Sequence, residues 1–241
     1  MIDLHAHVLP GIDDGARDLA ESLDMLRLAA ADGTRVLCAT PHALGPSHDV
    51  PRAAAEAAFA ALQDAARAAG IAIELRLAAE SWYRPDLPAL AREGRLATFS
   101  AGGKRYALIE FPPTHVPAEA LETCFALRLD GITPVIAHPE RNPSFWAWPE
   151  LADRLREQGA VLQVTAGSLT GLFRKESRAC AKALIERGAA DLLASDAHRR
   201  DRRPPGMSEA HRLAAKWAGR EAADRLVEGV PAALLLGEAL P

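Results

Sequence analysis

The sequence has few cysteines, no excess of positive charge and no long hydrophobic run, and each absence argues against a class of protein. The three cysteines, Cys38, Cys124 and Cys180, are odd in number and widely spaced, which argues against a disulfide framework and a cysteine-based zinc site. The net charge of −4 provides no basic field for nucleic acid. No apolar run reaches the roughly 18 residues of a transmembrane helix, so we expect no membrane insertion.

The cysteines also lack the spacing of a thiol-based phosphatase, because no arginine follows any of them six positions later. We therefore interpret all three as structural residues. No linker or charge run divides the chain, and 49% of its residues are hydrophobic, enough for a full core. The polar, acidic start does not resemble a signal peptide. We expect one domain over residues 1–241, located in the cytoplasm.

Short apolar segments alternate with longer amphipathic ones along the whole chain. The predicted strands are 2–6, 35–40, 71–79, 106–111, 133–138, 160–165 and 190–195. The predicted helices are 18–33, 51–69, 117–130, 148–159, 176–188 and 208–228. Strands separated by helical crossovers run parallel. Seven such units predict an α/β protein with a closed or nearly closed (β/α) barrel, whose active site lies at the carboxyl ends of the strands.

Histidines and carboxylates follow six of the seven predicted strands. The candidate metal ligands are His5, His7, Asp14, His42, Glu80, Glu110, His138, Asp196 and His198. His5 and His7 are two positions apart in a strand and therefore point to one side, which Asp3 shares as a candidate partner for a ligand imidazole. Mixed imidazole and carboxylate ligands suit Zn²⁺, Mn²⁺ or Fe²⁺. Nine ligands exceed the four of one tetrahedral ion, so we predict two or three metals with bridging groups.

Two arginines stand a few residues beyond predicted ligands, Arg141 after His138 and Arg203 after His198. Because a guanidinium matches two phosphate oxygens, metals and arginines at one barrel mouth indicate phosphate chemistry. The neighbouring arginines of "RRDRRPP", at 199, 200 and 202, are interpreted as solvated. The histidines that follow no strand, His48, His115 and His211, are interpreted as surface residues, with His115 close enough to the site to be a possible acid.

Several motifs in order along the chain carry a resemblance: "IDLHAHVLPGIDDGA", "ATPH", "LIEFP", "IAHPERN", "TAGSLTG" and "ASDAHRRDRRPP". They resemble the polymerase and histidinol phosphatase (PHP) superfamily, and within it the bacterial protein-tyrosine phosphatases of capsule and exopolysaccharide operons, the CpsB/YwqE type. The resemblance implies a distorted seven-stranded, TIM-barrel-like fold. It also implies a trinuclear, often manganese-dependent centre held by the nine residues named above, with Arg141 and Arg203 binding phosphate.

The sequence and this resemblance together predict a metal-dependent phosphomonoesterase that hydrolyses phosphotyrosine in proteins. The resemblance implies that the substrate is the tyrosine-rich tail of a polysaccharide-assembly tyrosine kinase. It favours Mn²⁺, with Fe²⁺, Zn²⁺ and Co²⁺ as alternatives. Three other functions stay open: a PHP phosphatase or phosphodiesterase for histidinol phosphate or a nucleotide, an amidohydrolase-type C–N hydrolase, and a metal-bound regulatory subunit.

Overall fold

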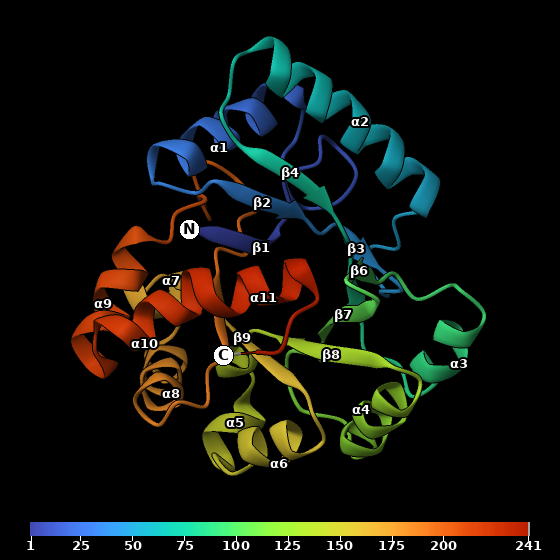
Figure 1. Ribbon diagram of the computed structural model, residues 1–241, viewed down its shortest axis with the longest axis vertical. Coiled ribbons are helices and arrows are strands. Elements are labelled where there is room, and N and C mark those ends of the chain that lie inside the picture. The colour runs from blue at the N-terminus through green and yellow to red at the C-terminus, as the bar shows by residue number, and fades with distance from the viewer. Residues whose placement is uncertain (241) are drawn as a thin grey trace.

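The computed structural model describes residues 1–240 as parallel strands surrounded by helices (Figure 1). The strands are β1 (Ile2–Ala6), β2 (Val36–Ala39), β3 (His42–Ala43), β4 (Glu74–Leu77), β5 (Glu80–Trp82), β6 (Phe99–Ala101), β7 (Lys104–Glu110), β8 (Ile132–Ala137), β9 (Val161–Thr165) and β10 (Leu192–Ala194). The first helices are α1 (Leu19–Ala31), α2 (Arg52–Ala68), α3 (Leu87–Arg92), α4 (Ala120–Leu129), the 3₁₀ turn η1 (Pro139–Arg141), α5 (Pro143–Ala147) and α6 (Leu151–Glu157). The later ones are α7 (Ala166–Thr170), α8 (Lys175–Glu186), α9 (Ser208–Ala218), α10 (Arg220–Asp224), the π-helix η2 (Arg225–Gly229) and α11 (Val230–Leu236).

The strands form two parallel sheets that together make a ring. One sheet has the order β1-β2-β4 and the other the order β10-β9-β8-β7-β5-β3, with β6 antiparallel to β7. Because β3 continues the line of β2 and β5 that of β4, the ring has seven strand positions. A parallel bridge between Ala6 and Ala197 joins its two ends, and the His7 amide donates to the Ala197 carbonyl at 2.7 Å. The predicted distorted seven-stranded (β/α) barrel is confirmed.

The third predicted strand, 71–79, is wrong in extent, because β4 and β5 replace it with a break between them. The second strand position is broken at the same level, between β2 and β3, where Pro41 stands. A proline has no amide hydrogen to donate to a ladder. The ladder nevertheless continues around Pro41, since its carbonyl accepts the Glu80 amide at 3.1 Å. In the restarted ladder His42 pairs in register with Glu80.

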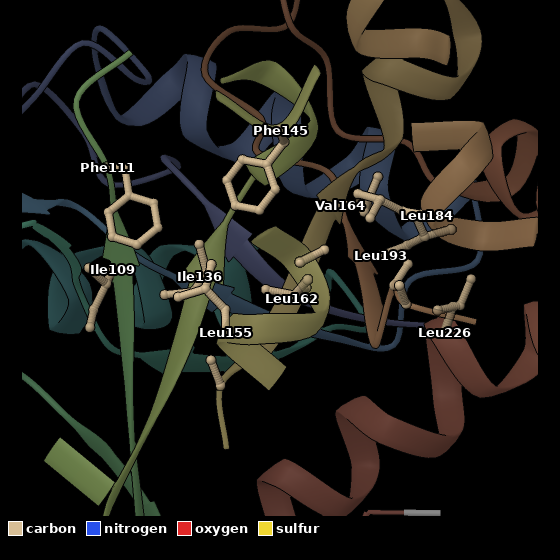
Figure 2. Packing of buried hydrophobic residues seen from close by; sticks show 14 of the residues in the cluster. Ile109, Phe111, Ile136, Phe145, Leu155, Leu162, Val164, Leu184, Leu193 and Leu226 are labelled. Atoms are coloured by element: carbon tan, nitrogen blue, oxygen red, sulfur yellow. The ribbon is translucent and has the colours of Figure 1, made fainter. Parts of the chain in front are cut away.

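Alternate residues of the strands pack into different apolar clusters. Ile109, Ile136 and Leu162 lie on the outer face under α3 to α10, in the cluster of Figure 2. Leu108 and Val135 of the same strands lie on the opposite, inner face, in a cluster that includes residues of α11. A third cluster packs α1 and α2 against β1, β2 and β4. The strands are therefore covered on both faces, as parallel sheets require.

Two predicted helices are interrupted. The helix expected over 208–228 is wrong as one element, because Gly219 adopts φ 91° and ends α9 before α10 begins. Glycine can adopt this conformation, but it is not helical, so the helix ends there. The helix expected over 148–159 covers only Leu151–Glu157, and Trp148 is not helical because the following Pro149 disfavours that conformation. Within residues 1–240, none of the helices has the length and hydropathy needed to cross a membrane.

Candidate metal centre

All nine predicted ligand residues converge at the carboxyl ends of the strands. His5 lies in β1 and His7 directly after it, while His42 and Glu80 begin β3 and β5. The others stand at the end of β7 or in the loops after β1, β8 and β10: Glu110, Asp14, His138, Asp196 and His198. The side chains of His5, His7, Glu80 and Asp196 are at most 1% exposed. Strand alternation and the ring topology thus gather acids and imidazoles in one space, which is buried at His5 and Glu80 and open at Asp14.

Three sets of donor atoms are close enough to hold metal ions. In the first set, His7, Asp14, His42 and His198 each offer an atom within 4.8 Å of the others. Asp14 Oδ1 is 3.3 Å from His42 Nε2 and 3.4 Å from His198 Nε2. His7 also belongs to a second set with His5 and Asp196. The shared imidazole places the two sets side by side.

The third set consists of His42, Glu80 and Glu110. His138 adjoins it, because its Nε2 is 3.1 Å from Glu80 Oε1 and 3.6 Å from Glu110 Oε1. Glu80 also reaches His5 Nε2 and His7 Nε2, each at 3.3 Å. The Glu80 carboxylate therefore touches donors of all three sets, and it would contribute a ligand wherever ions were held.

The hydrogen bonds of two histidines show which nitrogen of each imidazole faces the other ligands. The Nδ1–H of His7 donates to Asp13 Oδ2 at 2.9 Å, and that of His5 donates to Gln163 Oε1 at 2.8 Å. Each Nε2 therefore faces the cluster, where the two Nε2 atoms are only 3.2 Å apart and each is 3.3 Å from a Glu80 oxygen. Imidazole nitrogens this close to each other and to a carboxylate are stabilised by positive charge, which either protons or a metal ion can supply.

The pKa values of two of the imidazoles, His7 and His42, show the same demand for positive charge. Burial lowers the pKa of His7, yet hydrogen bonds to the Asp13 and Glu80 carboxylates raise it to about 9. His42 is likewise opposed by burial, and its contacts with Asp14 and Glu80 raise its pKa to about 11. These protons balance the negative charge of the neighbouring carboxylates, and a bound divalent cation would replace them. The donor set therefore fits metal ions.

Backbone conformation aims several of these side chains. His138 and Asp196 have positive φ angles of 34° and 50°, which non-glycine residues seldom adopt, and strain of this kind concentrates at functional sites. Gly15 approaches His7 so closely that an added Cβ would lie 2.1 Å from the His7 carbonyl oxygen. The turn "DDGA" needs glycine there to press Asp13 against the imidazole.

The two predicted phosphate-binding arginines lie beside the cluster. Arg141 Nη1 and Arg203 Nη1 both donate to Asp196 Oδ2, at 2.6 and 2.9 Å. Both guanidinium groups also lie over the Phe173 ring, 4.5 and 5.4 Å from its centroid. Arg200 differs, because it pairs with Asp24 on α1.

The sequence analysis missed several side chains of the site. Gln163 and Asp13 orient imidazoles, and a lone glutamine in the apolar run "AVLQVT" was the available signal. Asp3 was expected to contact an imidazole, but its Oδ1 accepts the backbone amides of Ser195 and His5 instead. His48 is not a plain surface residue, since its ring stacks on His42 with centroids 5.7 Å apart.

The other two histidines without a strand lie elsewhere. His115 is exposed, and its Nδ1 is 3.0 Å from Thr114 Oγ1. His211 is half-buried rather than fully exposed, and it contacts Asp224 at 2.7 Å. Neither contacts a predicted ligand.

Comparison with known proteins identifies the family of this chain. The model of a family described as capsular polysaccharide synthesis, CpsB/CapC, matches residues 1–236. The chain belongs to the CpsB/CapC family. The tyrosine-protein phosphatase YwqE of Bacillus subtilis is 38% identical over 204 residues, 82% of this chain and 77% of its own length. The tyrosine-protein phosphatase CpsB of Streptococcus pneumoniae is 27% identical over 99% of both chains.

Solved structures agree with membership of the CpsB/CapC family. A crystal structure from work on YwqE of Bacillus subtilis and CpsB of Streptococcus pneumoniae, described as metal-dependent tyrosine phosphatases, superposes with a TM-score of 0.93. It is 35% identical and covers 100% of this chain and 96% of its own. The phosphotriesterase homology protein of Escherichia coli, at 13% identity and a TM-score of 0.60, shares the fold alone. The resemblance seen in the sequence motifs is confirmed.

Proposed function

We propose that this chain is a metal-dependent phosphomonoesterase that hydrolyses phosphotyrosine in proteins. The observation that carries the proposal is the contact of both arginines with Asp196, a member of the buried donor cluster. That contact sets two phosphate-binding forks at the edge of a space suited to divalent cations. The CpsB/CapC relatives named as tyrosine-protein phosphatases support the same substrate class.

In this proposal the nine predicted residues hold the metals. They are His5, His7, Asp14, His42, Glu80, Glu110, His138, Asp196 and His198. Bound divalent metals would supply Lewis acidity and water activated near neutral pH. We propose two to three ions per chain, a range that follows from the donor count, with Mn²⁺ favoured over Fe²⁺, Zn²⁺ and Co²⁺. Asp13 and Gln163 keep the His7 and His5 imidazoles turned toward the ions.

The arginines would orient the phosphoryl group. Each guanidinium has five N–H donors, and one nitrogen of each is engaged with Asp196. The remaining donors stay available for non-bridging phosphate oxygens, and both side chains are partly open to solvent, 27% and 23% exposed. Such preset donors stabilise charge as it develops in the transition state.

The residues of the cluster determine which leaving group the site favours. Each imidazole and carboxylate of the nine-residue set contacts another member of the set, so none is free as a dedicated acid. A phenolate leaves without a proton donor, because the pKa of its conjugate acid is about 10. A serine alkoxide is far more basic. The site therefore favours aryl phosphates over alkyl phosphates.

We also propose that the whole chain acts as one catalytic domain, because β1 and the loop after β10 both supply the cluster. The substrate we propose is a tyrosine kinase of capsule or exopolysaccharide assembly, dephosphorylated in the cytoplasm. The description of the family as capsular polysaccharide synthesis supports that choice.

A substrate panel after metal reconstitution tests the proposal. Phosphotyrosine peptides and aryl phosphates should exceed phosphoserine peptides by at least ~10²-fold in kcat/KM. Faster turnover of histidinol phosphate or a nucleotide would make the enzyme a small-molecule phosphatase. Turnover of a dihydropyrimidine-like amide would indicate a C–N hydrolase, and no turnover with any metal would indicate a regulatory subunit.

A series of aryl phosphates of rising leaving-group pKa tests the missing acid. In the wild type, log kcat should fall steeply as leaving-group pKa rises, and His115→Ala should leave that slope unchanged. A shallow slope that becomes steep in His115→Ala would show that His115 supplies a proton.

A further inference from the structure

A groove beside Arg141 is bordered by the loop before α8, by α5 and by the loop after β7. Its volume is about 770 Å³, and its walls include Leu172, Phe173, Trp146, Pro113 and Pro143. Arg141, which also contacts Asp196, and Arg174 both line it. Leu172 is 49% exposed, a large value for a leucine. The groove is therefore an open apolar channel flanked by arginines.

The groove is continuous with the proposed active site. A smaller cavity of about 70 Å³ is lined by Glu110, His138, Arg141 and Pro113. Arg141 and Pro113 line both cavities. The smaller cavity thus leads from two predicted metal ligands to the groove. A molecule whose phosphate sat at the arginines could extend directly along the apolar walls.

Phe173 links the arginine pair to the groove. Its ring lies under the Arg141 and Arg203 guanidinium groups and also forms part of the groove wall. Stacking on an aromatic face restricts where a guanidinium can lie. Phe173 therefore positions the two arginines and also borders the space next to the phosphate that they would bind.

The charges of the groove indicate what it accommodates. Although the chain has a net charge of −4, no acidic residue lines this groove. Arg174 is exposed, and within residues 1–240 it has no ion pair. A complementary occupant has an apolar side chain next to the phosphorylated residue and an acidic residue beyond it. A polypeptide has this combination, whereas a free small phosphate ester would leave the groove empty.

We propose that this groove binds the segment of a protein substrate that flanks its phosphotyrosine, with Leu172 contacting an apolar side chain and Arg174 pairing with an acidic one. The proposal rests on the phosphotyrosine phosphatase function proposed above. It makes Leu172 and Arg174 specificity determinants that take no part in the chemical step.

The test compares three substrates in the metal-loaded enzyme. One phosphotyrosine peptide has leucine next to the phosphotyrosine and glutamate beyond it, a second has glycine and lysine there, and phenyl phosphate lacks both positions. The variants are Leu172→Ser and Arg174→Glu. The controls are Leu129→Ser on α4, 72% exposed, and Arg154→Glu on α6.

We expect each groove variant to raise KM for the leucine–glutamate peptide by about tenfold at unchanged kcat. Phenyl phosphate should change by less than about twofold, as should every substrate with the control variants. Equal effects on the peptide and phenyl phosphate, or none on either, would overturn the groove assignment. The wild type could also self-associate through this groove. If a groove variant weakened that association without changing the KM for the peptide, the groove would be a self-association surface and the assignment would be overturned. Failure of the wild type on phenyl phosphate and both peptides would instead refute the proposed function.

Discussion

The donor cluster and the arginine pair differ in how firmly they are held. His5 and Glu80 are at most 1% exposed and lie in strands of the ring. Arg141 and Arg203 are 27% and 23% exposed and lie in the turn η1 and in the loop after β10, where both contact the Asp196 carboxylate and the Phe173 ring. Metal coordination tolerates displacements of about 0.2 Å, whereas a phosphoryl group moves during its transfer. The rigid part suits ions and the looser part suits substrate.

The largest expected effect is in the cluster, at His7, one of the two imidazoles that belong to two donor sets. His7→Ala should lower kcat/KM by at least ~10⁴-fold, the scale of removing a member of an interdependent catalytic unit. Elemental analysis should find it depleted of metal relative to the wild type, for which we expect about two to three ions. Chelation of the wild type with EDTA should abolish activity, and Mn²⁺ should restore it.

Asp14→Ala is the matched variant for His7→Ala. Asp14 belongs to one donor set and is 48% exposed, so this variant should lose less metal than His7→Ala. Full activity of the wild type in EDTA, with no bound metal, would refute the metal-dependent function.

The arginine pair should show a smaller effect of a different kind. Arg141→Ala and Arg203→Ala should each lower kcat/KM by roughly 10²–10³-fold, as the loss of one transition-state donor does. Metal content should not change, because neither arginine is a ligand. Arg199→Ala is the control and should have little effect. Equal losses for Arg199 and Arg203 variants would mean that the arginines act only as a diffuse attractive field.

Sequence analysis predicted the candidate metal ligands more fully than the side chains that orient them. Parallel strands point their carboxyl ends the same way, so a histidine or acid after each strand, such as His42 or His138, predicts a common site. The partners were hidden because they depend on register and twist. Gln163 lies inside β9, and whether it meets His5 depends on how the ring is joined at Ala197. Phe173 comes from a loop that no periodicity describes.

Backbone interruptions limited the fold prediction in the same way. Pro41 and Gly219 were visible as residues, but the sequence could not show whether the chain would continue past them. The β-ladder restarts after Pro41 because the Pro41 carbonyl still accepts the Glu80 amide. The helix does not continue through Gly219, because its positive φ redirects the chain.

The residues that support the cluster should give an intermediate effect. Asp13→Ala removes the acceptor of the His7 Nδ1–H, so metal affinity should weaken by about 10–100-fold. Competition with a chromogenic chelator measures this affinity. Activity should recover substantially at saturating metal, which separates Asp13 from the ligands themselves. Asp64→Ala, an exposed change on α2, is the control. An Asp13→Ala protein with wild-type metal affinity would show that the hydrogen bond does not orient His7.

The smallest effect is expected at the three thiols, outside both regions. Cys38 and Cys124 are buried, and burial raises the pKa of each of the three thiols, including that of Cys180, to about 12. Thiols of such pKa are almost fully protonated at neutral pH and are poor nucleophiles. Replacing all three by alanine should therefore change kcat/KM by no more than a few-fold.

The thiol variant also needs a stability measurement, because loss of a buried side chain can unfold a protein without any role in chemistry. Thermal unfolding of the triple variant and of each single variant separates the two causes. We expect Cys38→Ala and Cys124→Ala to lower stability more than Cys180→Ala, since the Cys38 and Cys124 side chains are 2% and 1% exposed and lie in core clusters, whereas Cys180 is only partly buried. If a variant that unfolds at the wild-type temperature lost turnover, or if a phosphocysteine were trapped, the nucleophile would be a thiol and the metal-dependent function would be refuted.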